Sequence, residues 1–287
     1  MAHAIRNPAQ WLVEQTIALL GHARATAAQV GSDAGEMAEV EIRELTFDDI
    51  REAIEGGVAD FAACRTDVIF LCVLYPIVGF VLVWLAADNA LLPLIFPVVS
   101  GFALVGPIAA VGVYEMSRRR ELGESANWTT ALDVVRSPSF GAIVVLGLFF
   151  VVLFGLWILS ADAIYAVTLG PEPPASVAAF AAAALTTAAG WAMIVVGVFV
   201  GFLFAALALA VGVVSFPMLL DRPVGFPAAI LTSLRVTLRN PRVVFAWGAI
   251  VAASLAVASV PLLLGLVIVL PVLGHATWRL YRRAVSA

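Results

Sequence analysis

Long apolar runs separated by short polar segments fill the chain from about residue 68 to its end. A helix needs about 20 apolar residues to cross a bilayer. The pattern predicts about six transmembrane helices, which lie near residues 68–87, 91–113, 140–160, 191–216, 243–259 and 262–278. We therefore expect an all-α, polytopic membrane domain over residues 46–287. Residues 1–45 are polar to mixed and are predicted to form a partly disordered cytoplasmic segment.

Amphipathic segments precede three of the predicted spans, at residues 46–63, 127–136 and 226–239. In the first segment, apolar side chains recur at helical spacing, namely Phe47, Ile50, Ile54, Val58 and Phe61. Helices of this kind lie in the membrane–water interface with their apolar side toward lipid. All three segments are predicted to be surface helices on the side from which the next span begins.

The composition excludes a soluble protein. Apolar residues make up 62% of the chain and charged residues 13%, against about 45–50% and about 25% in soluble domains. The net charge is −4, and all 16 basic residues are arginine. These arginines do not form a basic soluble domain, so nucleic acid is not an expected partner.

The arginines also fix the predicted topology, because basic residues near span ends prefer the cytoplasm. With six spans, every arginine is cytoplasmic, and the outer loops carry only Asp88, Asp162 and Glu172. The fourth span is placed at 191–216, which leaves 175–189 as an interfacial helix or an extension. The last apolar run must break near Ser259-Val260-Pro261, since one long helix would leave three arginines outside. The chain is thus predicted to be a multi-pass protein of the inner membrane with both termini cytoplasmic.

A threefold repeat of a surface helix followed by a two-span hairpin is indicated, with units at about 46–120, 127–222 and 226–283. Ser137-Pro138 and Asn240-Pro241 end the second and third surface helices, because the residue before a proline is pushed out of helical geometry. Pro107 and Pro271 each precede an arginine, Arg118 and Arg282, by eleven residues. The first unit lacks the Ser/Asn-Pro step. Prolines and glycines also predict an irregular second span.

Few residues suggest chemistry. The chain has three histidines and no nucleotide, zinc or serine-hydrolase motif, so no cofactor, metal or catalytic residue is expected. His275 lies one helical turn before Arg279, and the repeat aligns Glu115 with Arg279. Ionisable residues at membrane depth are frequently functional, so these three form the candidate polar cluster. The alternative is structural: Glu115 and Arg279 form an interfacial ion pair, and His275 bonds a neighbouring helix.

Two further features concern lipid and helix contacts. The candidate anionic-lipid contacts are Arg118, Arg119, Arg120, Arg282 and Arg283, since a basic residue near an anionic leaflet contributes about 1 kcal/mol. Small residues let helices approach closely. They occur at Gly197-x-x-x-Gly201 and along a stripe of Ala249, Ala252, Ala256 and Ser259. Both sets are predicted to pack within the protein, with an oligomer contact as the alternative.

Four segments of the chain resemble a bacterial family known as predicted integral membrane proteins and built on a domain of unknown function. The segments are Asp60-Phe61, FPVVSGFALVGP (96–107), YEMSRRRE (114–121) and GHATWRLYRR (274–283). The resemblance covers roughly residues 42–283 and implies a multi-span inner-membrane protein without an established activity. Some members carry labels that relate them to cytochrome c oxidase subunit I, but a single membrane histidine here argues against a haem or copper centre.

The expected function is therefore that of a non-enzymatic scaffold, assembly or accessory subunit. Its expected partners are membrane lipids and either another membrane protein or a second copy of the chain. The alternative is a small-solute permease, which the proline-broken second span and the repeat favour. A polar-lined cavity that crosses the bilayer midplane would distinguish the permease from the scaffold.

Overall fold

The computed structural model describes residues 40–73, 77, 79, 81, 84, 89–261 and 263–286. Within these residues the chain is all-α, as the sequence predicts, with one isolated β-bridge between Ile42 and Val285. The helices are α2 (Phe47–Cys72), η1 (Asn89–Leu94), α4 (Ile95–Phe102), η2 (Ala103–Val105), α5 (Gly106–Ala109), α6 (Val111–Glu121), α7 (Trp128–Leu132), η3 (Asp133–Arg136), α8 (Phe140–Thr168), α9 (Val177–Thr186), α10 (Ala188–Asp221), α11 (Phe226–Arg239), α12 (Pro241–Ser259) and α13 (Leu266–Ala284). Residues 1–39 of the segment that is predicted to be partly disordered lie outside the described residues.

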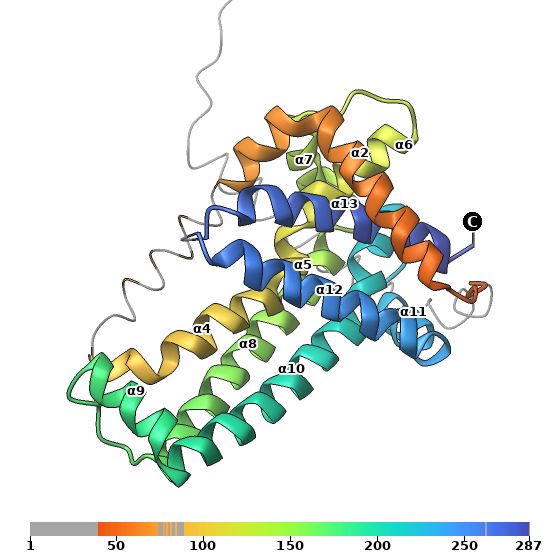
Figure 1. Ribbon diagram of the computed structural model, residues 1–287. Coiled ribbons are helices and arrows are strands. Elements are labelled where there is room, and N and C mark those ends of the chain that lie inside the picture. The colour runs from red at the N-terminus through yellow and green to blue at the C-terminus, as the bar shows by residue number, and fades with distance from the viewer. Residues whose placement is uncertain are drawn as a thin grey trace, which may run out of the picture.

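Three helices, α8, α10 and α12, are long and apolar enough to cross a membrane. They correspond to the predicted third, fourth and fifth spans. In Figure 1, α8 and α10 run side by side with α4 and form an arm, which ends at α9. At about 1.5 Å per residue, α10 is about 51 Å long, more than the bilayer core of about 30 Å. Its last third, from Ala208 to Leu219, is accordingly buried among other helices at the opposite end.

The second predicted span is irregular, as its prolines and glycines indicate. Residues 89–121 form a succession of short helical pieces instead of one helix. Pro93 lies inside η1, and Pro107 is the second residue of α5, in the first turn, where its missing N–H costs nothing. Gly101 allows α4 to lie close to α8, because a Cβ at this position would be 2.6 Å from the Phe154 ring.

The first surface helix departs from the prediction in length. α2 does not end at residue 63 but continues to Cys72, and the predicted first span, 68–87, falls largely outside the described residues. Phe47 and Val58 of the predicted apolar stripe are exposed, whereas Ile50 of the same stripe is buried. The buried positions are Ile50, Ala53, Gly57, Asp60 and Cys64. Small residues are selected there because α2 crosses α13 closely.

The other two surface helices begin and end where the sequence predicts. α7 and η3 cover 128–136, α11 covers 226–239, and the Ser-Pro and Asn-Pro steps terminate them.

Asn240 also connects the end of α11 to the residues that precede α2. Its side chain accepts a hydrogen bond from the Leu45 backbone (2.7 Å) and donates one to the Arg43 carbonyl (3.0 Å).

The two described ends of the chain meet beside this asparagine. The Arg43 amide donates to the Ala284 carbonyl, and Ile42 forms the β-bridge with Val285. Residues 40–46 and the C-terminus therefore lie on the same side of the protein.

The final apolar run is broken after Ser259, as predicted. α12 and α13 form a hairpin whose turn has a tight approach at Gly265, where a Cβ would lie 2.7 Å from the Ala258 carbonyl oxygen. From Leu273 onward, α13 is largely buried, mostly against α2 and α6. At Gly57 of α2, a Cβ would lie 2.8 Å from both the Ala276 amide nitrogen and the Val272 carbonyl oxygen.

Candidate functional site

Glu115 is buried on α6 and accepts hydrogen bonds from two arginines of the same helix. Its carboxylate lies 2.7 Å from Arg118 Nε and 2.7 Å from Arg119 Nε. Residues three and four positions apart face each other on a helix, so these pairs form locally. The predicted ion pair between Glu115 and Arg279 is therefore wrong.

Arg279 pairs instead with Asp60 of α2. Its Nε and Nη2 lie 2.9 and 2.8 Å from the two oxygens of the Asp60 carboxylate, in a bidentate arrangement. Arg120 adds a third bond to the same carboxylate at 3.1 Å. Asp60 is only 1% exposed. A buried carboxylate is tolerated when it is paired and hydrogen-bonded, and Asp60 meets both conditions.

The sequence interpretation did not include Asp60 among the site residues. A signal was present, since Asp60 continues the helical spacing of Ile50, Ala53 and Gly57 on one side of α2. A single acid within an otherwise apolar or small-residue stripe indicates a buried ion pair.

His275 is fully buried on α13, and its Nδ1 lies 2.6 Å from the Ser117 hydroxyl of α6. The predicted hydrogen bond to a neighbouring helix is thus confirmed. The Nε2 atom has no hydrogen-bond partner among the described residues.

The remaining candidate arginines join further helices to this region. Arg282 bonds Glu121 (3.0 Å) on α6 and Asp221 (3.0 Å) at the end of α10. The Tyr281 hydroxyl donates to Asp221 (2.7 Å), and the Trp278 indole donates to Glu121 (3.0 Å).

Arg283 extends the same network to the beginning of α2, where it pairs with Asp49 (3.1 Å) and Glu52 (2.6 Å). Burial raises the pKa of the Asp49 carboxyl, but hydrogen bonds from Thr46 and Arg283 outweigh it and hold this pKa below its ordinary value. Asp49 is therefore ionised at neutral pH and pairs with Arg283.

We call this assembly the arginine cluster; its members are Asp49, Asp60, Glu115, Arg118, Arg119, Arg120, Glu121, Asp221, His275, Arg279, Arg282 and Arg283. It unites α2, α6, α13 and the end of α10, shown at the upper end of the molecule in Figure 1. Every arginine predicted to contact anionic lipid has a carboxylate partner here. Among the described residues, no group of three or more His, Cys, Asp or Glu side chains could hold a metal ion. The geometry of the arginine cluster is that of a structural junction between helices.

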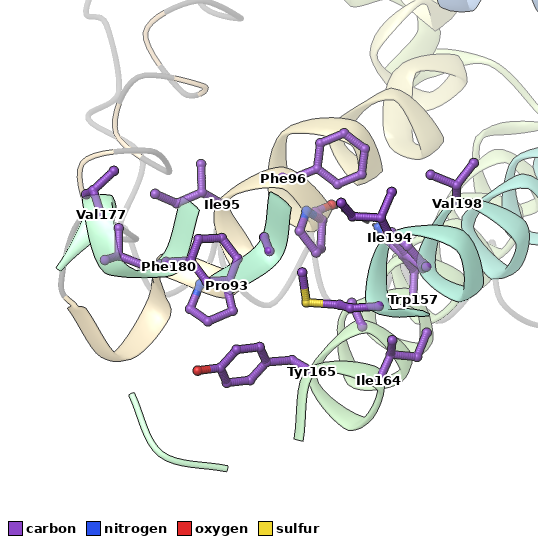
Figure 2. A pocket seen from close by; sticks show the side chains of 16 residues that line it. Pro93, Ile95, Phe96, Trp157, Ile164, Tyr165, Val177, Phe180, Ile194 and Val198 are labelled. Atoms are coloured by element: carbon purple, nitrogen blue, oxygen red, sulfur yellow. Dashed lines mark hydrogen bonds between the residues drawn. The ribbon is translucent and has the colours of Figure 1, made fainter. Parts of the chain in front are cut away.

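A second feature lies in the arm, away from the arginine cluster. A groove of about 520 Å³ opens between η1–α4, α8, α9 and α10. Its lining is apolar and aromatic (Figure 2), with Tyr165 and Phe180 at one end and Trp157 at the other. Of the residues that the sequence analysis singled out, the groove is lined by Gly197 of the small-residue pair and by Pro93 and Pro97 of the irregular second span.

Comparison with known proteins supports the membrane assignment. Residues 95–221 match the model of a family described as "Predicted integral membrane protein (DUF2189)". The resemblance is confirmed over this segment, which includes FPVVSGFALVGP and YEMSRRRE but not Asp60-Phe61 or GHATWRLYRR. The match covers less than half of the chain and names no activity. No curated protein and no solved structure matches.

Proposed function

We propose that this integral membrane protein is a non-enzymatic scaffold or accessory subunit of the inner membrane, with both termini in the cytoplasm. It holds a partner membrane protein against an exposed side of α12, while the arginine cluster fixes the helices on the cytoplasmic side. The observation that carries this proposal is the exposure of small residues along α12.

Ala249, Ala252 and Ala256 recur at helical spacing on α12, and all three are exposed. The interpretation that this stripe packs within the protein is therefore wrong for these residues. Small side chains let two helix backbones approach closely, which is how membrane helices associate without a hydrophobic driving force. The side of α12 that carries these exposed alanines is therefore suited to close packing with a helix from another chain.

The arginine cluster supports the same role. Its charges are paired across α2, α6, α10 and α13, and this arrangement gives the cytoplasmic end fixed geometry. Asp60 is buried, and breaking the ion pairs of a buried carboxylate is costly, so its pairs with Arg120 and Arg279 favour one arrangement of α2, α6 and α13. A transporter that alternates between conformations would have to break and reform them.

The permease alternative has one observation in its favour, namely the groove beside the broken second span. Broken helices line transport sites in several transporter folds. The lining of this groove, however, is apolar, with Phe96, Trp157 and Phe180 among its residues. Such a lining offers a polar solute no compensation for its lost hydration. The observation therefore favours an apolar ligand over a transported polar solute.

A photo-cross-linking amino acid at Ala252 will test the scaffold role. We expect it to yield a discrete protein adduct in cells, because this position faces the proposed helix contact. The matched control is the same amino acid at Val257, which is 72% exposed but about 140° around the helix. We expect lipid adducts alone there. Equal protein labelling at both positions, or lipid labelling alone at both, would contradict the proposal.

A further inference from the structure

The length of the groove in the arm matches one leaflet of a bilayer. Its α8 lining runs from Trp157 to Tyr165, two turns or about 12 Å at 1.5 Å per residue. The hydrocarbon core is about 30 Å thick, so one leaflet contributes about 15 Å. Tyr165 is three residues from the end of α8, where an aromatic residue marks the interface. Trp157 is therefore near the midplane, and the groove extends over most of the leaflet opposite the arginine cluster.

The polar atoms in the lining are already bonded within the protein. Trp157 Nε1 donates to the Pro97 carbonyl at 2.9 Å. The Tyr165 hydroxyl donates to the Glu172 carbonyl at 2.7 Å. The remaining side chains of the lining are hydrocarbon, apart from the thioether of Met193. A ligand with a polar group in this space would leave that group without a partner at a substantial cost. The chemistry of the groove thus selects a hydrocarbon.

The groove is a built part of the fold, because α9 forms one of its walls and is fixed in place. Ser176 caps α9 by accepting a hydrogen bond from the Ala179 amide at 3.1 Å. The Phe180 and Tyr165 rings lie 6.2 Å apart, which holds α9 against α8. At the α9–α10 junction, a Cβ on Gly190 would collide with the carbonyl oxygens of Ala183 and Ala184. Only glycine permits the fold-back that closes this side.

We propose that the groove is a binding site for one acyl chain of a bilayer phospholipid, held between α4, α8, α9 and α10. Its volume of about 520 Å³ lies in the range of ligand pockets, about 300–1,000 Å³. The chain enters from the leaflet in which the groove opens, and its end reaches the indole of Trp157. The headgroup stays at the level of Tyr165 and the loop that follows α8. This inference does not depend on the proposed scaffold role.

Gly197 provides the variant that tests the site. It lines the groove, and a Cβ on it would meet no atom within 4 Å, so a larger side chain fills the groove without a backbone clash. The matched control is Gly155 of α8, which also has open space around it but is not part of the lining. Both leucine substitutions replace a glycine in a membrane-spanning helix, so they change helix propensity equally. If Gly197→Leu does not fold, Val198→Phe fills the same groove from a neighbouring position.

The protein is purified from membranes, washed in a delipidating detergent, and analysed by native mass spectrometry. We expect wild type and Gly155→Leu to retain a phospholipid, and Gly197→Leu or Val198→Phe to lose it. In vesicles of phosphatidylethanolamine and phosphatidylglycerol, a phosphatidylethanolamine with a diazirine in its acyl chain should label Met193 and its neighbours in wild type. The filled variants should fall to the labelling level of the lipid-exposed side of α10. Retention of an isoprenoid quinone in place of a phospholipid, or of no lipid in wild type, would overturn the proposal.

Discussion

Replacing Gly57 with alanine is expected to destabilise the protein by about 2 kcal/mol, although one methyl group is all that is added. The new Cβ would lie 2.8 Å from two backbone atoms of α13, at Val272 and Ala276, and backbone atoms cannot move aside as a flexible side chain can. α2 must therefore shift away from α13. The free energy of unfolding in detergent, followed by helical content during denaturant titration, measures the effect.

The adjacent Gly56 provides the control for this prediction. A Cβ there would lie 3.5 Å from the Arg279 side chain, which is an ordinary contact. Alanine also has a higher helix propensity than glycine, by about 1 kcal/mol. We expect Gly56→Ala to be neutral or stabilising. Equal effects of the two substitutions would show that the close crossing of α2 and α13 is not present.

Replacing Asp60 with asparagine is expected to cost about 3 kcal/mol. Removing one member of a buried ion pair costs about 3–5 kcal/mol, because the remaining charge is left unpaired. We take the lower end of this range of energies because the side chains of Arg120 and Arg279 are 32% and 36% exposed. Water therefore screens part of their charge. Denaturant titration of the purified protein measures the loss.

Asp48→Asn is the matched control, because Asp48 pairs with Arg51 at 3.3 Å on the same helix but is 79% exposed. An exposed pair contributes about 0–1 kcal/mol, so this variant should unfold close to wild type. The assignment of Asp60 as the anchor of the arginine cluster fails if both variants unfold at the same denaturant concentration.

The features that the sequence predicts correctly depend on local patterns. Apolar length identifies α8, α10 and α12, and the steps at Pro138 and Pro241 mark the ends of two surface helices. Both signals act within a few turns of chain. They hold whatever the tertiary contacts are, because bilayer thickness and proline geometry are fixed.

The features that the sequence misses depend on contacts between distant segments. The apolar stripe identified in the sequence consists of large residues, whereas the side of α2 that is buried against α13 includes Ala53 and Gly57. The repeat alignment placed Glu115 and Arg279 at equivalent positions, but equivalence in a repeat does not imply contact. Glu115 pairs with Arg118 one turn away on its own helix, and Arg279 pairs with Asp60 of α2, which is distant in the sequence.

The groove illustrates the same limit more strongly. Its lining comes from four segments between residues 92 and 198. The sequence marks the first of them as irregular by its prolines, and the other three have only an apolar pattern. Only the fold-back of α9 at Gly190 and the kinked path of η1 and α4 leave space between them. No local pattern encodes a space of this kind.

The proposed scaffold role, with the arginine cluster on the cytoplasmic side, requires that the two ends of the arm lie on opposite sides of the membrane. Single cysteines at Leu122, which is 60% exposed beside the cluster, and at Glu172, in the loop beyond α8, test this directly. They are introduced after Cys64 and Cys72 have been replaced by alanine, and a membrane-impermeant maleimide is added to cells whose outer membrane is made permeable. The cysteine at 172 should react in intact inner membranes, and the cysteine at 122 only after the inner membrane is opened. Reaction of the cysteine at 122 from outside, or equal reaction of both, would contradict the topology and the scaffold role that is built on it.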